Sequence, residues 1–489
     1  MKKIWSLILS LSLLLSLAAP AFAEETENEP SGPENATAPS AQQTLSCRTM
    51  DAPVSLAGNQ NLLKTCDAAF LYELNSDTLL YAYNPDMQMF PGSLTKIMTC
   101  LILAEKGNMD DQITVTQAAL DAVPWNAYGM DLVVGEIVTM EQLMYAIMVE
   151  SANDAVTVAA LHVTSTVDAF VEEMNRRAEE LGCTGTHFDN PYGLHSEGNY
   201  TTARDMAKIT REAVKIPAFW DCYSTSYYEM PATNLSEPRY FRTSNYMIYS
   251  TVMFNYYDPS IQGGKVGTTY MDTWNAVISA EKRNTKYIVV TLGGDITINE
   301  ETGATLAFGN LEDARGLLDF AYEDYKNAET VCAGQAVAQY PVVNGANDVA
   351  LGAKEGVLSL LPANMTSAEI RREVHVDESL LKAPLEEGVT VGTLECWYRN
   401  FCVGTTELVT LAPVAVSTAS VPLDGVQEQA PEAAEDKGSG SKTVLEVFGA
   451  VFLVLLFVFL AFTVRTFVIR SRRQRRRDRR RAEERRRRR

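Results

Sequence analysis

The spacing of apolar and polar positions predicts two hairpins that lie far apart in the chain. The runs 68–74 and 79–83 alternate as strands do, and a short polar turn separates them. The apolar runs 274–280 and 287–292 flank a second polar turn at 282–284. We therefore expect strands to come from both ends of this part of the chain.

Helical periodicity fills the sequence between the two hairpins. Apolar residues recur at helical spacing over 94–102, 140–148, 155–161, 167–181 and 201–214. A further helix is expected over 311–325, with Leu317 and Leu318 facing inward. Strands at both ends and helices in the middle predict an α+β fold, an antiparallel sheet covered by helices.

The pattern of apolar and polar residues changes from 329 to 414. Short alternating runs such as 371–376 and 389–394 are separated by Gly, Pro and Asn. This pattern predicts a small all-β domain after the larger domain, which we place at 63–328.

The first residues are typical of a secretory signal peptide, expected at 1–23. Lys2 and Lys3 precede an apolar run, and Ala21-Phe22-Ala23 forms a small-x-small cleavage site. An uncleaved anchor is the alternative. The next segment, 24–62, is rich in Glu, Pro, Ala and Ser, and we expect a flexible acidic spacer with ordered structure starting near Leu63.

The last residues predict a membrane anchor. A Pro-, Ala- and Gly-Ser-rich linker at 415–443 precedes an expected transmembrane helix at 444–469 and a basic tail at 470–489. By the positive-inside rule the tail is cytoplasmic, which places the rest of this single-pass cell-membrane protein outside the cytoplasm. Contact of the tail with anionic lipid and RNA binding by the tail both remain open.

Charge narrows the choice of partners. The chain has 489 residues, 46% hydrophobic, with a net charge of −20. From Arg465 onward there are fifteen Arg and only three acidic residues, so the rest is more acidic still. No nucleic-acid partner is expected for this acidic bulk.

Eight cysteines match no zinc-binding spacing. Export would permit disulfides, and Cys396 and Cys402 are close enough in sequence to bridge a hairpin. The pairing itself cannot be derived from the sequence.

The first candidate for chemistry is Ser93-Leu94-Thr95-Lys96. Pro91 and Gly92 make a turn before it, and Ser93 suits a helix start. Ser93 and Lys96 are three residues apart and so share one helix face, which pairs a hydroxyl with a potential base. Alone, this motif is weak, because Ser-x-x-Lys occurs by chance in most chains of this length, and a capped surface helix is the better interpretation.

Two further motifs change that reading. Ser151-Ala152-Asn153 and Lys265-Val266-Gly267 follow in order behind the signal peptide. The three motifs together resemble those of penicillin-binding proteins and class A β-lactamases. The segments 186–194 and 200–206 are closer still to the low-molecular-mass penicillin-binding proteins, the serine-type D-alanyl-D-alanine carboxypeptidases.

The resemblance implies a penicillin-binding-protein/β-lactamase-like transpeptidase fold and an acyl-enzyme mechanism. The substrate would be a peptidoglycan pentapeptide ending in D-Ala-D-Ala, β-lactam antibiotics would acylate the same serine, and no metal or cofactor is expected. The implied catalytic residues are Ser93, Lys96 and Ser151, and the implied substrate-binding residues are Asn153, Lys265, Gly267, Thr268 and Thr269.

Within this scheme Lys96 must be neutral to accept the Ser93 proton, although a lysine ordinarily has a pKa near 10.4. We expect burial and the nearby cation Lys265 to lower the pKa of Lys96. By the same resemblance, the backbone N–H groups of Ser93 and Thr268 would form the oxyanion hole.

Val266 departs from the family pattern, which usually has Thr. A Thr hydroxyl there would face the substrate carboxylate, so we expect weaker affinity for that carboxylate here. The Arg that many relatives place before the last helix is also missing, since the chain has Gly309-Asn310-Leu311.

Three other functions stay open at this stage. One is an inactive wall-binding module on a membrane anchor, which the intact motif residues disfavour. The others are a D,D-endopeptidase and a β-lactamase, although no candidate deacylating Glu of the class A type is apparent.

Overall fold

The computed structural model describes residues 45–58, 60–125, 127–250, 256–269, 273–302 and 304–417, which belong to one compact unit. The expected signal peptide, transmembrane helix and basic tail lie outside these residues, as does nearly all of the 415–443 linker. Within the described ranges, no single helix has the length and hydropathy of a membrane span, although the bent pair Asn153–Val163 and Val167–Glu180 together meet that criterion.

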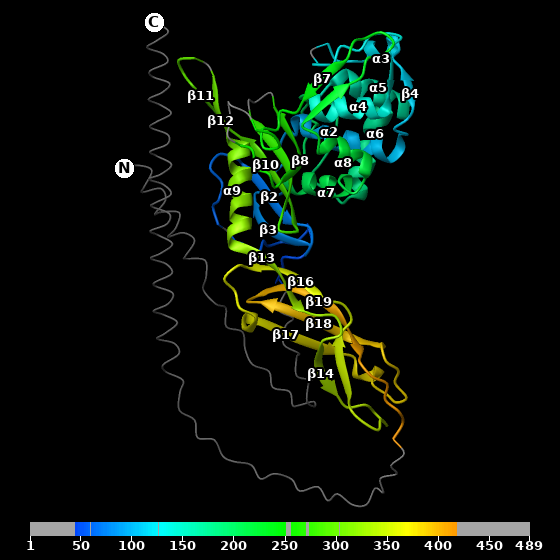
Figure 1. The fold of residues 1–489 in the computed structure, drawn as a ribbon, viewed down its shortest axis with the longest axis vertical. Coiled ribbons are helices and arrows are strands. Elements are labelled where there is room, and N and C mark those ends of the chain that lie inside the picture. Colours follow the sequence, from blue (N-terminus) through cyan, green and yellow to red (C-terminus); the bar gives the residue numbers. More distant parts are fainter. Residues whose placement is uncertain are drawn as a thin grey trace, which may run out of the picture. The chain divides into compact units, whose positions relative to one another are not determined.

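A five-stranded antiparallel sheet forms the centre of the first domain (Figure 1). Its strand order is β3-β2-β10-β9-β8. The strands are β2 (Ala68–Glu73), β3 (Thr78–Tyr83), β8 (Ile261–Thr268), β9 (Trp274–Lys282) and β10 (Thr285–Gly294). Both expected hairpins are confirmed, and β2 pairs with β10, so the two ends of this part of the chain meet in one sheet.

The two faces of the sheet pack against different helices. Phe70 and Tyr72 on β2 belong to the core shared with the middle helices, whereas Ala69 and Leu71 belong to the core on the opposite face. Figure 1 shows α9 (Gly309–Asp324) lying along that second face. The period-two alternation of the strand is therefore satisfied on both sides by apolar contacts.

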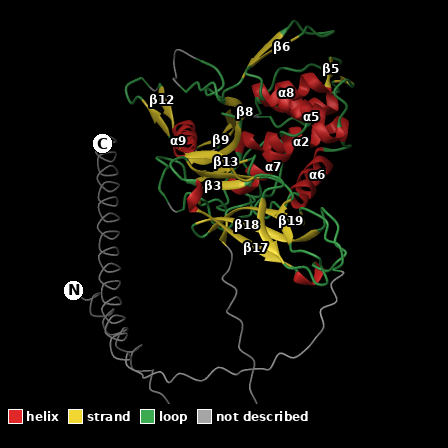
Figure 2. Cartoon of the chain, turned by 60° about the horizontal axis from the view of Figure 1, so that its bottom comes forward, coloured by secondary structure: helices red, strands yellow, loops and turns green. Residues whose placement is uncertain are grey.

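The middle helices form one group, drawn in red in Figure 2. They are α2 (Thr95–Lys106), α3 (Gln117–Asp121), α4 (Met140–Tyr145), α5 (Asn153–Val163), α6 (Val167–Glu180), α7 (Ala203–Ala213) and α8 (Pro217–Tyr223). Thr202 caps α7 by accepting a hydrogen bond from the backbone N–H of Asp205 at 3.1 Å.

Short elements complete this domain. A 3₁₀ turn, η1 (Gly92–Leu94), precedes α2, and a π-helical turn, η2 (Ala146–Glu150), follows α4. Three two-stranded sheets pair β4 (Gln112–Thr114) with β5 (Ile137–Thr139), β6 (Tyr227–Met230) with β7 (Arg239–Arg242), and β11 (Ile296–Ile298) with β12 (Thr305–Phe308).

The region after α9 is all-β, as expected. One sheet has the order β14-β15-β19-β18-β17, and β13 pairs separately with β16. The strands are β13 (Tyr325–Val331), β14 (Ala336–Tyr340), β15 (Val349–Ala353), β16 (Val357–Pro362), β17 (Ile370–Val376), β18 (Thr390–Tyr398) and β19 (Phe401–Thr410), with 3₁₀ turns η3 (Ser367–Glu369) and η4 (Glu378–Leu380).

The expectation that the spacer extends to residue 62 is wrong for its last part. β1 (Leu45–Ser46) pairs in parallel with β19, and the Arg48 guanidinium donates to the carbonyl of Val403 at 2.8 Å. Cys47 and Met50 are buried. A strand this short is stabilised by pairing with Phe401 and Cys402, which lie far along the chain, so local composition cannot reveal it.

The suggested bridge between Cys396 and Cys402 is also wrong. All eight cysteines are described, and all are free thiols. In the β18–β19 pairing, Cys396 lies opposite Gly404 and Cys402 lies opposite Trp397. The two thiols are therefore not cross-strand partners, although both lie close to the hairpin turn.

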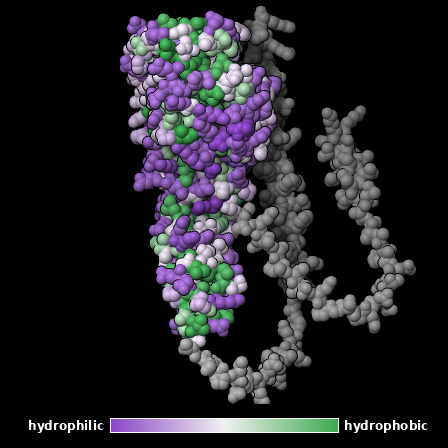
Figure 3. Space-filling model, turned by 90° about the vertical axis from the view of Figure 1, so that its right-hand side faces the viewer, coloured by the Kyte–Doolittle hydropathy of each residue, from purple (hydrophilic) through white to green (hydrophobic). Residues whose placement is uncertain are grey.

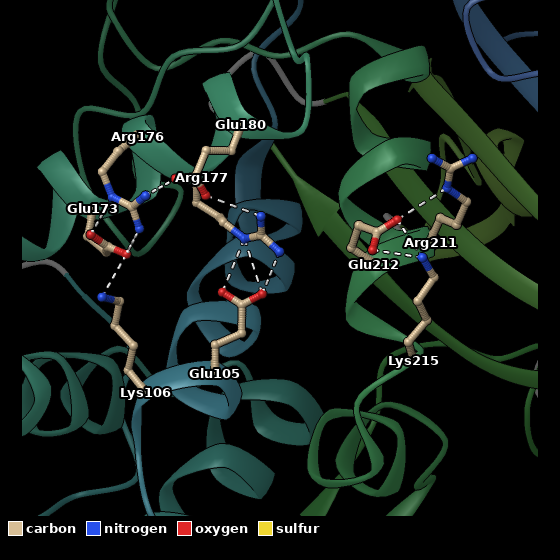
Figure 4. A network of polar contacts seen from close by, with 9 residues as sticks. All are labelled: Glu105, Lys106, Glu173, Arg176, Arg177, Glu180, Arg211, Glu212 and Lys215. Carbon is tan, nitrogen blue, oxygen red and sulfur yellow. Dashed lines mark hydrogen bonds and ion pairs between the residues drawn. The ribbon is translucent and has the colours of Figure 1, made fainter.

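Ion pairs fasten α6 to the helix that follows Ser93 (Figure 4). Arg177 of α6 contacts the Glu105 carboxylate of α2 at 2.7 Å, and Glu173 contacts Lys106 at 3.0 Å. Each pair is partly exposed and contributes little alone, but together they bridge the two helices at the carboxyl end of α2. The face drawn in Figure 3 is largely hydrophilic, in keeping with the burial of apolar residues in the two cores.

Candidate active site

Ser93 lies in the η1 turn, where the chain passes from the sheet side into α2. The Asn275 side chain on β9 donates to the carbonyls of Phe90 and Pro91 at 2.9 and 3.1 Å, which fixes this turn to the sheet. Ser93 does not cap the helix. Leu94 is the residue directly before α2, and neither η1 nor α2 has a side-chain capping hydrogen bond. The Ser93 hydroxyl is thus available for other contacts.

Lys96 lies one helical turn further on and is almost fully buried, with 1% of its surface exposed. Its Nζ is 3.5 Å from the Ser93 hydroxyl oxygen and donates to the carbonyl of Tyr192 at 2.6 Å. Burial, and secondly the charge of Lys265, hold the pKa of Lys96 well below its usual value. The expected direction and causes of this pKa shift are confirmed.

Ser151 brings a second hydroxyl to Ser93. Its Oγ donates to the Ser93 Oγ at 3.1 Å. Ser151 has a left-handed backbone, φ 67°, at the junction between the η2 turn and α5. For a residue other than glycine this conformation is strained, and it turns the chain sharply where the hydroxyl must point back to Ser93.

Asn153 begins α5 next to this turn. Its backbone N–H donates to the carbonyl of Tyr128 at 2.9 Å, while its side-chain Oδ1 is buried and has no hydrogen-bond donor among the described residues. The neighbouring Asp154 accepts from the backbone N–H groups of Met130, Leu132 and Ala155 at 2.8 to 3.1 Å. Asp154 therefore supports the loop and the helix start.

Strand β8 brings the third motif to Ser93. Lys265 is 2% exposed, and burial lowers its pKa to about 8. A Cβ on Gly267 would lie only 2.9 Å from the Ser93 backbone nitrogen, so only glycine allows the strand to pass this close. Thr268 ends the strand and is exposed, and the Thr269 backbone N–H donates to the carbonyl of Thr273 at 3.0 Å.

The Val266 side chain does not face the substrate side of the sheet, where we expected the residue at this position to lie. It is 5% exposed and packs in the apolar core on the α9 side of the sheet, opposite Ala276 in the pairing. A threonine here would therefore place its methyl and hydroxyl groups among apolar side chains. Asn310, at the start of α9, is also fully buried, and its side chain donates to the carbonyl of Asn275 at 3.0 Å.

Sequence reasoning did not identify the role of the loop at 190–194. The Asn190 side chain accepts from the backbone N–H groups of Tyr192, Gly193 and Leu194 at 2.9 to 3.2 Å, and the Tyr192 hydroxyl contacts Thr157 at 2.9 Å. These bonds hold the carbonyl that Lys96 contacts. The resemblance of 186–194 to the family pattern was the available signal. The contact itself is made by a backbone carbonyl, which any residue type could supply, so the sequence does not identify it.

The described residues include one group of three close ligands of the kind that metals prefer, Glu373, His375 and Glu395. These residues lie on β17 and β18 of the all-β region, outside the three motifs. The motif residues themselves offer hydroxyl, amine and amide groups. This set is suited to nucleophilic catalysis by a serine with a neutral lysine as base.

Two family profiles match the chain. Residues 58–296 match the family described as D-alanyl-D-alanine carboxypeptidase, and residues 325–415 match the penicillin-binding protein 5 C-terminal domain. The second match covers the all-β region.

Curated relatives cover the same part of the chain. D-alanyl-D-alanine carboxypeptidase DacF of Bacillus subtilis is 27% identical over 333 residues, 67% of this chain and 80% of the relative. D-alanyl-D-alanine carboxypeptidase DacA of Haemophilus influenzae is 26% identical over 335 residues, with the same shares.

Solved structures share the fold of both domains. Penicillin-binding protein 5 of Haemophilus influenzae superposes with a TM-score of 0.58 at 25% identity, over 73% of this chain and all of the other. Penicillin-binding protein 6B of Escherichia coli, at 23% identity and a TM-score of 0.55, has a similar fold over 73% of this chain and 98% of its own.

Proposed function

Because this chain belongs to the family of D-alanyl-D-alanine carboxypeptidases, we propose that it removes the terminal D-alanine from peptidoglycan stem peptides through an acyl-enzyme on Ser93. The observation that carries this proposal is the approach of two side chains to the Ser93 hydroxyl. Lys96 Nζ lies 3.5 Å and Ser151 Oγ 3.1 Å from Ser93 Oγ. The expected boundaries, 63–328 for the catalytic domain and 329–414 for the small β domain, form part of the proposal, with 45–62 added to the folded part.

Acylation begins at the carbonyl carbon between the two terminal D-alanines. Ser93 Oγ attacks that carbon, and the neutral amine of Lys96 takes the hydroxyl proton. The negative charge that develops on the carbonyl oxygen is met by the backbone N–H groups of Ser93 and Thr268. The close approach of Gly267 to the Ser93 nitrogen supports this pairing of η1 and β8.

The C–N bond then breaks, and the leaving D-alanine amine needs a proton. Ser151, hydrogen-bonded to Ser93, relays it from protonated Lys96. The Asn153 side chain holds the amide of the bound peptide, a role supported by its buried Oδ1 without a donor. Lys265, Thr268 and Thr269 bind the substrate carboxylate, and water finally releases the shortened peptide.

The test is direct. The full chain is incubated with a pentapeptide that ends in D-Ala-D-Ala, and the masses of the products are measured by mass spectrometry. Loss of one alanine is expected for the wild type and not for Ser93→Ala. A fluorescent penicillin should label the wild type covalently, because a β-lactam mimics acyl-D-Ala-D-Ala, and equal labelling of Ser93→Ala would contradict the mechanism.

We also propose that the catalytic domain is held outside the cytoplasm by the apolar segment 444–469, with the Arg-rich tail inside. A protease added to intact, wall-stripped cells should then remove the catalytic region and leave the tail protected. Degradation of the tail with the catalytic region spared would reverse this topology.

A further inference from the structure

Glu150 places a carboxylate beside the candidate active site. It is the residue directly before Ser151, and the left-handed turn at Ser151 sends the two side chains in different directions. The Ser151 hydroxyl reaches Ser93, whereas the Glu150 carboxylate accepts a hydrogen bond from the Tyr128 hydroxyl. Tyr128 is 60% exposed, so the carboxylate lies at a solvent-accessible rim.

The same loop links this carboxylate to the substrate-binding residues. The Tyr128 carbonyl accepts from the backbone N–H of Asn153 at 2.9 Å. On the other side, β7 packs beside the η2 turn, and the backbone N–H of Arg242 points at Glu150 Oε2 over 3.4 Å. The Glu150 carboxylate is thus held between the 127–131 loop, the η2 turn and β7, all next to the residues proposed for catalysis.

The charge of Glu150 has no cationic side-chain partner within ion-pair distance among the described residues. The nearest arginines are engaged elsewhere. Arg239 pairs with the buried Glu136 at 2.6 Å, and the Arg242 guanidinium stacks over the rings of Tyr227 and Tyr249 at 5.8 and 5.6 Å from their centroids. Lys265 is influenced by the charge of Glu150 but forms no ion pair with it. A carboxylate that is fixed by a tyrosine and has no ion-pair partner attracts a cation from outside.

We propose that Glu150 binds a cationic group of the substrate, an ammonium on the side chain of the residue that precedes D-alanyl-D-alanine. This inference rests on the proposed function, and it assigns Glu150 as a specificity-determining residue and Tyr128 as a positioning residue. The acyl part of the substrate must reach Ser93, so the residue before it lies within a few ångströms along the peptide. Its side chain then extends toward the rim that Glu150 and Tyr128 form.

Two substrates of nearly the same shape test this assignment. Nα-acetyl-L-lysyl-D-Ala-D-Ala carries a free side-chain ammonium, and Nα,Nε-diacetyl-L-lysyl-D-Ala-D-Ala does not. The full chain is assayed with both near pH 7 at low ionic strength, and the ratio of the two kcat/KM values is compared. We expect roughly a tenfold preference for the ammonium in the wild type, the size of one charge-assisted hydrogen bond at a partly exposed site.

Variants then locate the source of the preference. In Glu150→Gln the ratio should fall to about one, because glutamine still accepts from the Tyr128 hydroxyl but carries no charge. In Glu150→Lys it should fall below one, and in Tyr128→Phe it should be intermediate. The matched control is Glu141→Gln, an exposed glutamate at the other end of the same helical run, which should keep the wild-type ratio.

The two kcat/KM values distinguish a failure of this inference from a failure of the proposed function. No release of D-alanine from either peptide would contradict the carboxypeptidase proposal itself. Release from both peptides at equal rates by the wild type, or an unchanged preference in Glu150→Gln, would overturn only the role of Glu150. Loss of the preference in Asp131→Asn, with Glu150→Gln unaffected, would assign it to the other acid of the loop. Added salt should reduce the wild-type ratio, which tests the charge without any substitution.

Discussion

The side-chain nitrogen of Lys96 donates a hydrogen bond to the backbone carbonyl of Tyr192 at 2.6 Å. A neutral lysine amine has two N–H bonds and one lone pair. Donation to a fixed carbonyl uses one N–H and restricts the direction of the lone pair, which must face Ser93, 3.5 Å away. The loop at 190–194 therefore orients the proposed base as well as burying it.

The pH dependence of acylation should depend on Lys265. Its charge helps to lower the pKa of Lys96, so in Lys265→Gln the pKa of Lys96 should rise toward its ordinary value. Because acylation needs neutral Lys96, the rise of rate with pH should move to higher pH in this variant. The measurement is the rate constant for fluorescent penicillin between about pH 5 and 10.

The control for this profile is Lys282→Gln. Lys282 is exposed and lies over the Tyr322 ring at 4.1 Å, so its removal should leave the shape of the profile unchanged. A Lys265→Gln profile that shifts to lower pH would contradict the electrostatic account.

Burial of Lys265 should reduce stability at neutral pH. Its folded pKa of about 8 lies below the model-peptide value of 10.5, so the unfolded chain binds the proton more tightly. Stability is then lost as pH falls from about 10.5 toward 8, and the loss is complete below 8. Lys265→Met should raise the free energy of unfolding near pH 7 by up to about 3 kcal/mol.

Chemical denaturation at several pH values measures this gain. The difference between Lys265→Met and wild type should vanish above about pH 10.5. Lys326→Met, at an exposed position, should show no such pH-dependent gain. A difference that grows with rising pH would have the wrong sign for this account.

Gly267→Ala should impair acylation much more than folding. The new Cβ would lie 2.9 Å from the Ser93 nitrogen and 3.1 Å from that of Leu94, so β8 or η1 must shift. A displacement near 1 Å at a reacting centre typically lowers the rate about a hundredfold. The rate constant for penicillin acylation and the Tm are measured together.

Gly316→Ala is the matched control for this substitution. Gly316 lies inside α9, and a Cβ there meets nothing within 4 Å. Alanine should stabilise the helix by about 0.5–1 kcal/mol and leave acylation unchanged. Equal acylation rates for Gly267→Ala and wild type would show that β8 does not constrain Ser93.

Val266→Thr should lower stability and give no gain in kcat/KM. The sequence alone suggested that the added hydroxyl would meet the substrate carboxylate, with a gain of up to about two orders of magnitude. The side chain instead lies in the core on the α9 side, 5% exposed, where an unpaired hydroxyl costs about 1–3 kcal/mol. Denaturation and pentapeptide kinetics decide between these outcomes, with Val266→Ala as the size control. A faster enzyme would restore the first expectation.

The sequence by itself determined the family, the three motifs and most of the elements. Periodicity located the β2–β3 and β9–β10 hairpins and the long helices, because each of these buries a regular apolar stripe within one continuous segment. The Ser93–Lys96 pairing was likewise local, since the two residues are close in sequence, on either side of the junction between η1 and α2.

Tertiary structure decided everything that depends on residues distant in the chain. Three contacts show this: Tyr192 with Lys96, Glu150 with Tyr128, and β1 with β19. Each joins two segments that are distant in the chain, and neither segment's sequence indicates its partner. The face of the sheet on which the Val266 side chain lies could also be determined only from the folded sheet. Both faces of this sheet are buried, so hydrophobicity does not indicate which face a residue occupies. Backbone contacts and faces of this kind are set by packing, and packing is a property of the whole fold.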